Sequence, residues 1–172
     1  ITTTQSNKDF SNKTTFEAVY NTVVSGEDRY VYLVTNEQEV ETLELLNRWT
    51  NTLPSIGLKM KTGLTVDFRN REVLRNVPED QAVPLFDSQH IQDGKVVFPI
   101  GKEHEYIVTN QASLLQPNAN YLLVKRFTAK EEHRRLQCGV YLARKYPDYS
   151  KISTQNKINF IGGLKELSEC IV

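Results

Sequence analysis

The sequence predicts an α+β fold: a twisted, mostly antiparallel sheet of short strands, with one main helix near the N-terminus and a short C-terminal helix. Two observations support this. Short runs of β-branched and aromatic residues recur along the 172 residues, separated by turn residues. Strands and helices do not alternate regularly, which argues against a doubly wound parallel sheet.

The first part of the chain contains the clearest helix signal. Asn36 is a favourable N-cap, Glu39 follows three residues later, and apolar residues continue at helical spacing. A strand is predicted just before this helix, over residues 29–34. Thr14 is followed by a glutamate at capping-box spacing, so a small helix is expected to begin there.

The remaining elements are mostly predicted strands. Leu58 to Phe68 alternates apolar with polar residues, so we expect one half-buried strand, or two strands that break at Gly63. Asp93-Gly94 is a tight-turn signal. Further strands are predicted over 83–86, 95–100, 106–109, 121–127, 136–143 and 156–161, and a short helix over 164–170.

The net charge is zero, but basic residues gather in two blocks. Residues 58–76 carry five basic and two acidic side chains, and residues 121–145 carry seven and two. Lys125 and Arg126 lie at the end of a predicted strand. Thr128 and Glu131 then have capping-box spacing, which predicts a helical N-terminus. The free N–H groups of a helical N-terminus suit a phosphate. If the blocks share a face, they favour a polyanion partner. The alternative is a solvated surface with local Arg–Glu pairs.

Catalytic motifs are few. The sequence has no dinucleotide-binding or P-loop motif, and its histidines lack metal-ligand spacing. Asp87 with Asp93 and Lys95 resembles the carboxylates and lysine of a Mg²⁺-dependent nuclease, which is the enzymatic alternative. Asp93-Gly94 also has a structural explanation as a hairpin turn.

Four strings carry a family resemblance: LKMKTGLTVDFRNREVLR, VPLFDSQHIQDGKVVFP, NYLLVKRFTAKEEHRRLQCGVYLA and NKINFIGG. From about Leu58 to Gly163, they resemble the C-terminal target recognition domain of bacterial restriction–modification DNA adenine-N6 methyltransferases related to Eco57I and PaeR7I. The resemblance implies that residues 49–172 recognise duplex DNA. Residues 1–48 would pack on, or link to, a separate N-terminal catalytic domain of the same parent chain.

The family's catalytic tetrapeptide is missing, because the sequence contains no Pro-Pro pair, and the family's glycine-containing cofactor motif is absent too. The resemblance therefore implies a non-catalytic fragment without a cofactor of its own, and S-adenosylmethionine would bind to the parent's catalytic domain. The sequence begins without methionine, which favours a fragment. Its polar start, short apolar runs and two cysteines predict a cytoplasmic protein that does not associate with membranes.

The resemblance and the charge pattern together predict the site residues. Contacts with base edges are assigned to the polar run Ser88, Gln89 and His90, because these residue types commonly contact bases. A further alternative is a protein-interaction module that packs on its parent through the acidic helix face of residues 37, 41 and 44. No catalytic or metal-binding residue is predicted. Phosphates are assigned to Lys59, Lys61, Arg69, Arg71, Lys125, Arg126, Lys130, Arg134 and Arg135.

Overall fold

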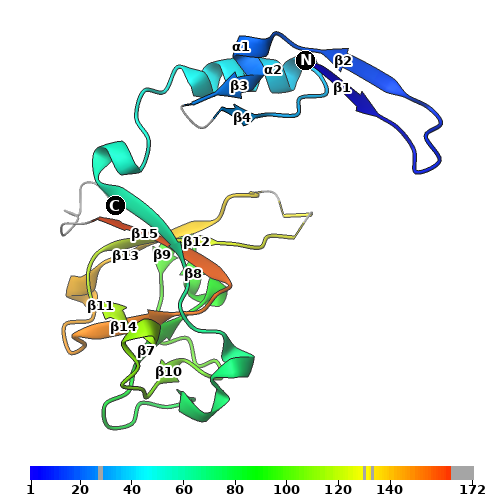
Figure 1. The fold of residues 1–172 in the computed structure, drawn as a ribbon. Coiled ribbons are helices and arrows are strands. Elements are labelled where there is room, and N and C mark those ends of the chain that lie inside the picture. The colour runs from blue at the N-terminus through cyan, green and yellow to red at the C-terminus, as the bar shows by residue number, and fades with distance from the viewer. Residues whose placement is uncertain (27–28, 130, 133, 164–172) are drawn as a thin grey trace. The chain divides into compact units, whose positions relative to one another are not determined.

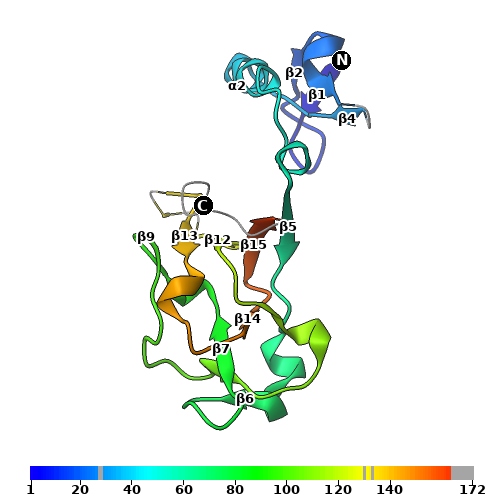
Figure 2. The same ribbon diagram turned by 90° about the vertical axis from the view of Figure 1, so that its left-hand side faces the viewer.

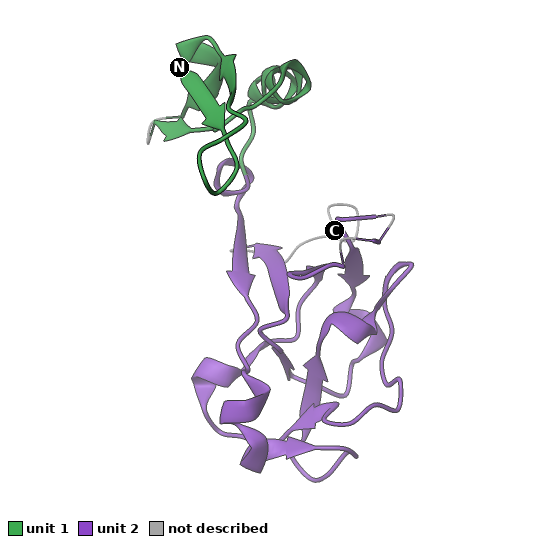
Figure 3. Cartoon of the chain, turned by 90° about the vertical axis from the view of Figure 1, so that its right-hand side faces the viewer, with its two compact units in different colours: residues 1–52 green, residues 53–172 purple. Residues whose placement is uncertain are grey.

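Figure 1 shows the fold as given by a computed structural model, which describes residues 1–26, 29–129, 131–132 and 134–163. The chain divides into two compact units, unit 1 (Ile1–Thr52) and unit 2 (Leu53–Val172), which are coloured separately in Figure 3. The roles predicted for segments 1–48 and 49–172 stay predictions. No helix among the described residues is long and apolar enough to cross a membrane.

Unit 1 combines two small hairpins with two helices around a core of Val23, Val34 and Leu43. The predicted helix at Thr14 is wrong. Residues 14–17 pair with residues 2–5 as a β-hairpin, because both segments are rich in β-branched threonines. The elements are β1 (Thr2–Gln5), β2 (Thr14–Glu17), α1 (Tyr20–Val23), β3 (Val24–Ser25), β4 (Tyr30–Val31) and α2 (Glu37–Asn47).

Helix α2 begins as the sequence predicts. The Oδ1 atom of Asn36 accepts a hydrogen bond from the Glu39 N–H at 2.9 Å, which satisfies one free donor of the first turn. The Glu39 carboxylate in turn accepts from the Thr35 N–H at 2.7 Å. Strand β4 covers only two residues of the strand predicted over 29–34.

Unit 2 contains a six-stranded sheet in the order β5-β15-β12-β13-β9-β8, part of which is seen in Figure 2. Neighbours in this sheet are antiparallel except β13 and β9, so the prediction of a mostly antiparallel arrangement is confirmed. The strands are β5 (Leu58–Thr62), β8 (Ile91–Gln92), β9 (Gly94–Val96), β12 (Tyr121–Lys125), β13 (Cys138–Tyr141) and β15 (Ile158–Gly163).

A second sheet of unit 2 has the order β11-β14-β7-β10-β6. Strand β14, which the sequence did not predict, pairs in parallel with β7. The larger apolar cluster brings together both sheets, with Phe86 and Ile152 from one and Tyr141 and Phe160 from the other. The strands are β6 (Leu74–Arg75), β7 (Val83–Phe86), β10 (Tyr106–Ile107), β11 (Gln116–Pro117) and β14 (Lys151–Thr154).

Only the first half of the stretch from Leu58 to Phe68 forms a strand. Strand β5 ends at Thr62, because the next residue, Gly63, lies against the backbone of Gln155 so closely that a Cβ would collide with its carbonyl group. The strand break that the sequence allows at Gly63 is thus observed, and a close backbone approach explains the glycine. The prediction of a single half-buried strand is wrong, since Met60 and Phe68, which would lie on its buried face, are 55% and 65% exposed. The helix predicted over 164–170 lies outside the described residues.

Candidate nucleic-acid interface

The two basic blocks leave the six-stranded sheet at the same end. Strand β15 lies between β5 and β12 and is antiparallel to both, so β5 and β12 run in the same direction. Thr62 at the end of β5 pairs with Asn159, and Lys125 at the end of β12 pairs with the adjacent Ile158. The segments that follow β5 and β12 therefore emerge on either side of the start of β15 (Figure 1).

An ion pair and a backbone hydrogen bond tie these exits together. The Nζ of Lys157, just before β15, lies 3.0 Å from Oδ2 of Asp67 in the segment after β5. The N–H of Arg126, just after β12, donates to the Lys157 carbonyl at 3.0 Å. The Arg126 guanidinium also donates to the Asn156 carbonyl at 2.9 Å. We call Asp67, Phe68, Arg69, Arg126, Phe127 and Lys157 the exit cluster.

The β5 exit presents arginines to solvent. A 3₁₀ turn over Asp67–Arg69 is held by the Asn70 side-chain amide, which donates to the Val66 carbonyl at 2.8 Å. Arg69 is exposed, and its guanidinium carbon lies 5.4 Å from the centroid of the Phe68 ring. Arg71 is exposed and lines a hollow of about 580 Å³ together with Asp67, Phe68, His104 and Lys157.

The β12 exit differs from the prediction in its local structure. Among the described residues 126–129, 131–132 and 134–137 there is no helix. A single turn, in which the Glu132 N–H donates to the Ala129 carbonyl at 3.2 Å, stands where a helical N-terminus was expected after Thr128. Lys125 is half-buried, while Arg126, Arg134 and Arg135 are exposed. Arg134 lines a small hollow near the hairpin turn at Asp93-Gly94. The predicted phosphate ligand Lys130 lies outside the described residues.

Lys59 and Lys61 lie in another hollow. They pair across β5 and β15 with Gly162 and Phe160, and both lysines are exposed. Directly paired residues point to the same face of a sheet, so these lysines lie on the side of the buried Phe160. The hollow they line, of about 440 Å³, extends to the Ala112–Pro117 segment.

His90 does not reach a base edge, which corrects the prediction for this residue. Its side chain is fully buried, and its Nδ1 and Nε2 atoms lie 3.1 and 3.0 Å from carboxylate oxygens of Asp87 and Glu105. Asp87 also caps the turn that contains His90, which explains the local pattern of polar residues. Ser88 is half-buried and Gln89 is exposed, so their assignment to base edges stays a prediction.

The buried carboxylates in this region are ionised by their partners. Burial raises the pKa of Asp87, but hydrogen bonds from His90 and Lys102 outweigh that effect and hold the pKa well below its ordinary value of 3.8. Burial likewise raises the pKa of Glu105, while bonds from the Ile100 and Gly101 N–H groups and from His90 lower it on balance. The network therefore stabilises the fold.

This network also weakens the nuclease alternative. The Asp87 carboxylate already bonds to the Gln89 N–H at 2.8 Å and to the Lys102 ammonium at 2.9 Å, so it is poorly suited to hold Mg²⁺. Asp93 lies in the hairpin turn between β8 and β9 at a φ of 47°. The described part of the chain contains no group of three His, Cys, Asp or Glu residues that could hold a metal ion.

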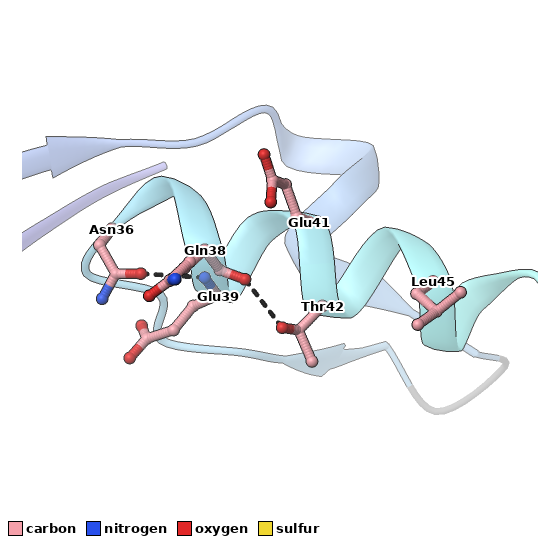
Figure 4. Close-up of a pocket in the computed structure, with 6 residues that line it drawn as sticks. All are labelled: Asn36, Gln38, Glu39, Glu41, Thr42 and Leu45. Carbon is pink, nitrogen blue, oxygen red and sulfur yellow. Dashed lines mark hydrogen bonds between the residues drawn. The ribbon is translucent and has the colours of Figure 1, made fainter.

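Unit 1 offers a hollow of a different character, which Figure 4 shows along α2. It is lined by one face of the helix and carries two carboxylates, so it does not suit a phosphate. The Thr42 hydroxyl in this hollow donates to the Gln38 carbonyl at 2.8 Å. The residues that line the hollow are Asn36, Gln38, Glu39, Glu41, Thr42 and Leu45.

Sequence inspection overlooked several site residues. Lys157 sits in a charge-balanced stretch, and only the pairing of β15 with its neighbours brings it to the basic exits. Phe68 and Phe127 were each placed on a predicted strand, although both are exposed. Arg75, by contrast, is held away from the site, because it pairs with Glu79 at 2.9 Å and donates to two backbone carbonyls.

Comparisons with known proteins place the chain among relatives of restriction–modification methyltransferases. It is 37% identical to the Type II methyltransferase M.PstI of Providencia stuartii over 158 residues, which cover 87% of the chain and 30% of that protein. It is 33% identical to the Type II methyltransferase M.BsuBI of Bacillus subtilis over 119 residues, 66% of the chain and 23% of that protein. No family model and no solved structure matches.

The chain is homologous to these Type II methyltransferases over most of its length. It spans less than a third of the length of these curated relatives. The predicted resemblance is confirmed to that extent. The narrower relation to Eco57I and PaeR7I and the specificity for adenine stay predictions.

Proposed function

We propose that unit 2 is the duplex DNA recognition module of a restriction–modification adenine methyltransferase. The observation that carries this proposal is the emergence of both basic segments on either side of the start of β15. Basic residues gathered at one end of a sheet can follow a phosphate backbone, which supplies most of the affinity of such modules. The homology to Type II methyltransferases gives this surface a natural partner in duplex DNA.

The residue roles follow from exposure and position. Arg69, Arg71 and Arg126 bind phosphates at the exits, joined by Lys157. Lys125, Arg134 and Arg135 extend this surface along the β12–β13 connection, and Lys59 and Lys61 bind more distant phosphates. Lys130, which lies outside the described residues, is a further phosphate ligand by its place in the sequence. The exposed Gln89 and its neighbour Ser88 contact base edges.

In this proposal the chain itself catalyses no reaction. A separate N-terminal domain of the parent enzyme binds S-adenosylmethionine and methylates adenine after the base leaves the helix. The recognition module holds the duplex in place for that domain. The parent enzyme works in the cytoplasm, where the DNA is.

The experiment that tests this proposal measures binding of the chain to a labelled duplex by fluorescence anisotropy at low and moderate salt. The double variant Arg69→Gln/Arg126→Gln removes one charge from each exit and should weaken binding about tenfold or more at low salt. Lys151→Gln, an exposed lysine of β14 outside the exit cluster, serves as the matched control and should change binding by less than about twofold. If the wild-type chain does not bind duplex DNA, the proposal is wrong.

A second role is supported for unit 1, as a surface that packs on the catalytic domain of the parent. Its core is small, whereas many of its large apolar side chains are exposed, which is typical of an interaction surface. Leu33, Trp49 and Tyr30 are 75%, 70% and 62% exposed. Co-purification of the chain with a separately expressed catalytic domain tests this role. Leu33→Asp/Trp49→Asp should abolish the association without reducing DNA binding by unit 2.

A further inference from the structure

Two aromatic side chains of unit 2 are exposed at the strand exits. Phe68 and Phe127 are 65% and 68% exposed. The other aromatic residues among the described residues 53–129, 131–132 and 134–163 are buried or half-buried. A phenylalanine costs free energy when it stands in water, so exposed aromatic residues confined to one part of a surface indicate a binding role.

Each exposed ring carries a neighbouring arginine. The guanidinium carbon of Arg69 lies 5.4 Å from the centroid of the Phe68 ring, and that of Arg126 lies 5.1 Å from the centroid of the Phe127 ring. These are cation–π distances. The same combination of a flat apolar face and a positive charge suits a nucleotide, whose base stacks while its phosphate pairs with the cation.

The two pairs are linked through the start of β15. Asp67, next to Phe68, forms an ion pair with Lys157, whose carbonyl accepts from the N–H of Arg126, next to Phe127. The Arg126 side chain is further fixed on the Asn156 carbonyl at 2.9 Å. The backbone that carries both rings is thus anchored to one turn.

We propose that Phe68 and Phe127 form a stacking site for unpaired bases, so that the exit cluster prefers DNA with an opened segment over a fully paired duplex. In intact B-DNA the base faces are covered by their neighbours, so aromatic rings gain little from them. Where pairing is broken, each exposed base can stack on a ring. This inference rests on the proposed DNA-binding function and adds a preference that phosphate contacts alone do not give.

The test compares two labelled probes in anisotropy titrations of the whole chain: a fully paired duplex, and the same duplex in which three central bases of one strand are changed so that they no longer pair. The wild-type chain should bind the mismatched probe about tenfold more tightly, because base–aromatic stacking contributes that much or more. Phe68→Leu/Phe127→Leu keeps apolar side chains but removes the rings. It should lose this preference and still bind the paired duplex within about twofold of the wild type.

Val97→Ala, at an exposed apolar residue just after β9, is the matched control and should retain the preference. Thermal melts should be alike for all three proteins, since the substituted side chains are exposed. Equal binding of both probes by the wild-type chain would overturn the stacking site and leave the DNA-binding proposal intact. A preference that survives in the Phe68→Leu/Phe127→Leu variant would also overturn it. Failure to bind either probe would overturn both proposals.

Discussion

Lys157 and Asp67 form an ion pair of 3.0 Å between segments that are 90 residues apart in the chain. The pair fastens the segment after β5 to the turn before β15, and the adjacent Arg126 extends the contact to the segment after β12. Burial raises the pKa of the Asp67 carboxyl, but its hydrogen bond to Lys157, a backbone hydrogen bond and the charge of Lys157 together outweigh this and lower the pKa below 3.8. The Asp67 carboxylate is therefore ionised at neutral pH.

Replacing Lys157 should affect DNA binding more than stability. Both side chains of the pair are partly exposed, so Lys157→Gln should lower the free energy of unfolding by less than about 1 kcal/mol in urea titrations. It also removes a positive charge next to Arg126, so the slope of log K against log[salt] should become shallower by about 1 if Lys157 contacts a phosphate. An unchanged slope would remove Lys157 from the interface.

Gly63 should be intolerant of any side chain. A Cβ at this position would meet the backbone carbonyl of Gln155, which cannot move without disturbing the hydrogen bond that it accepts from the Ile158 N–H. Gly63→Ala should therefore cost more than about 2 kcal/mol of unfolding free energy. Thr62→Ala, at the exposed neighbouring position, should cost much less in the same urea titration. Similar losses for both variants would contradict the close contact.

Substitutions of His90 and Gln89 should separate effects on stability from effects on DNA recognition. His90→Ala removes one hydrogen-bond partner from each of the buried Asp87 and Glu105 carboxylates and leaves a buried cavity, so it should cost about 3 kcal/mol or more of unfolding free energy. Gln89→Ala, at an exposed position, should change stability by less than about 0.5 kcal/mol. If Gln89 reads a base, this variant should also reduce the discrimination between a cognate and a scrambled site. A stable His90→Ala variant would contradict the buried network.

The same network predicts a stability loss in acid. The folded-state pKa values of Asp87 and Glu105 lie below the ordinary values of 3.8 and 4.5, so their stabilisation is complete above those values. Stability should fall as the pH drops below about 4.5 and through the lowered folded-state values.

Lys102→Met removes the ammonium that pairs with Asp87, so its unfolding free energy should be lower at pH 7 and should change less between pH 5 and pH 3. Urea titrations at several pH values check this. Parallel pH profiles for the variant and the wild type would show that Lys102 does not hold the Asp87 pKa down.

Local signals predicted much of the fold. The Asn36 cap, the Asp93-Gly94 turn and the apolar run at Tyr121–Lys125 act over a few residues, and each appears where expected. The errors arose where distant pairing overrides local preference. Thr14 has a capping-box spacing but belongs to a strand because a second threonine-rich segment is available to pair with it. Similarly, β5 ends at Thr62 and does not continue to Phe68, because Gly63 meets the backbone of the distant Gln155.

The candidate site was predictable in composition and less so in geometry. The two charge blocks pointed to Arg69 and Arg126 as phosphate-binding residues. The strand order that brings both to one end of a sheet is a long-range property that the sequence does not display. His90 was assigned to DNA because its residue type suits a base edge. Its burial depends on Glu105, fifteen residues away, which no local pattern reveals.

The most direct test of the central claim is a salt titration of duplex binding by the 172-residue chain and its Arg69→Gln/Arg126→Gln variant. If both strand exits contact phosphates, log K should fall with log[salt] by about 0.9 for each phosphate contact, and the variant should show a slope shallower by about 2. A wild-type chain whose duplex affinity is independent of salt, or a variant with the wild-type slope, would contradict a DNA interface formed by the two exits.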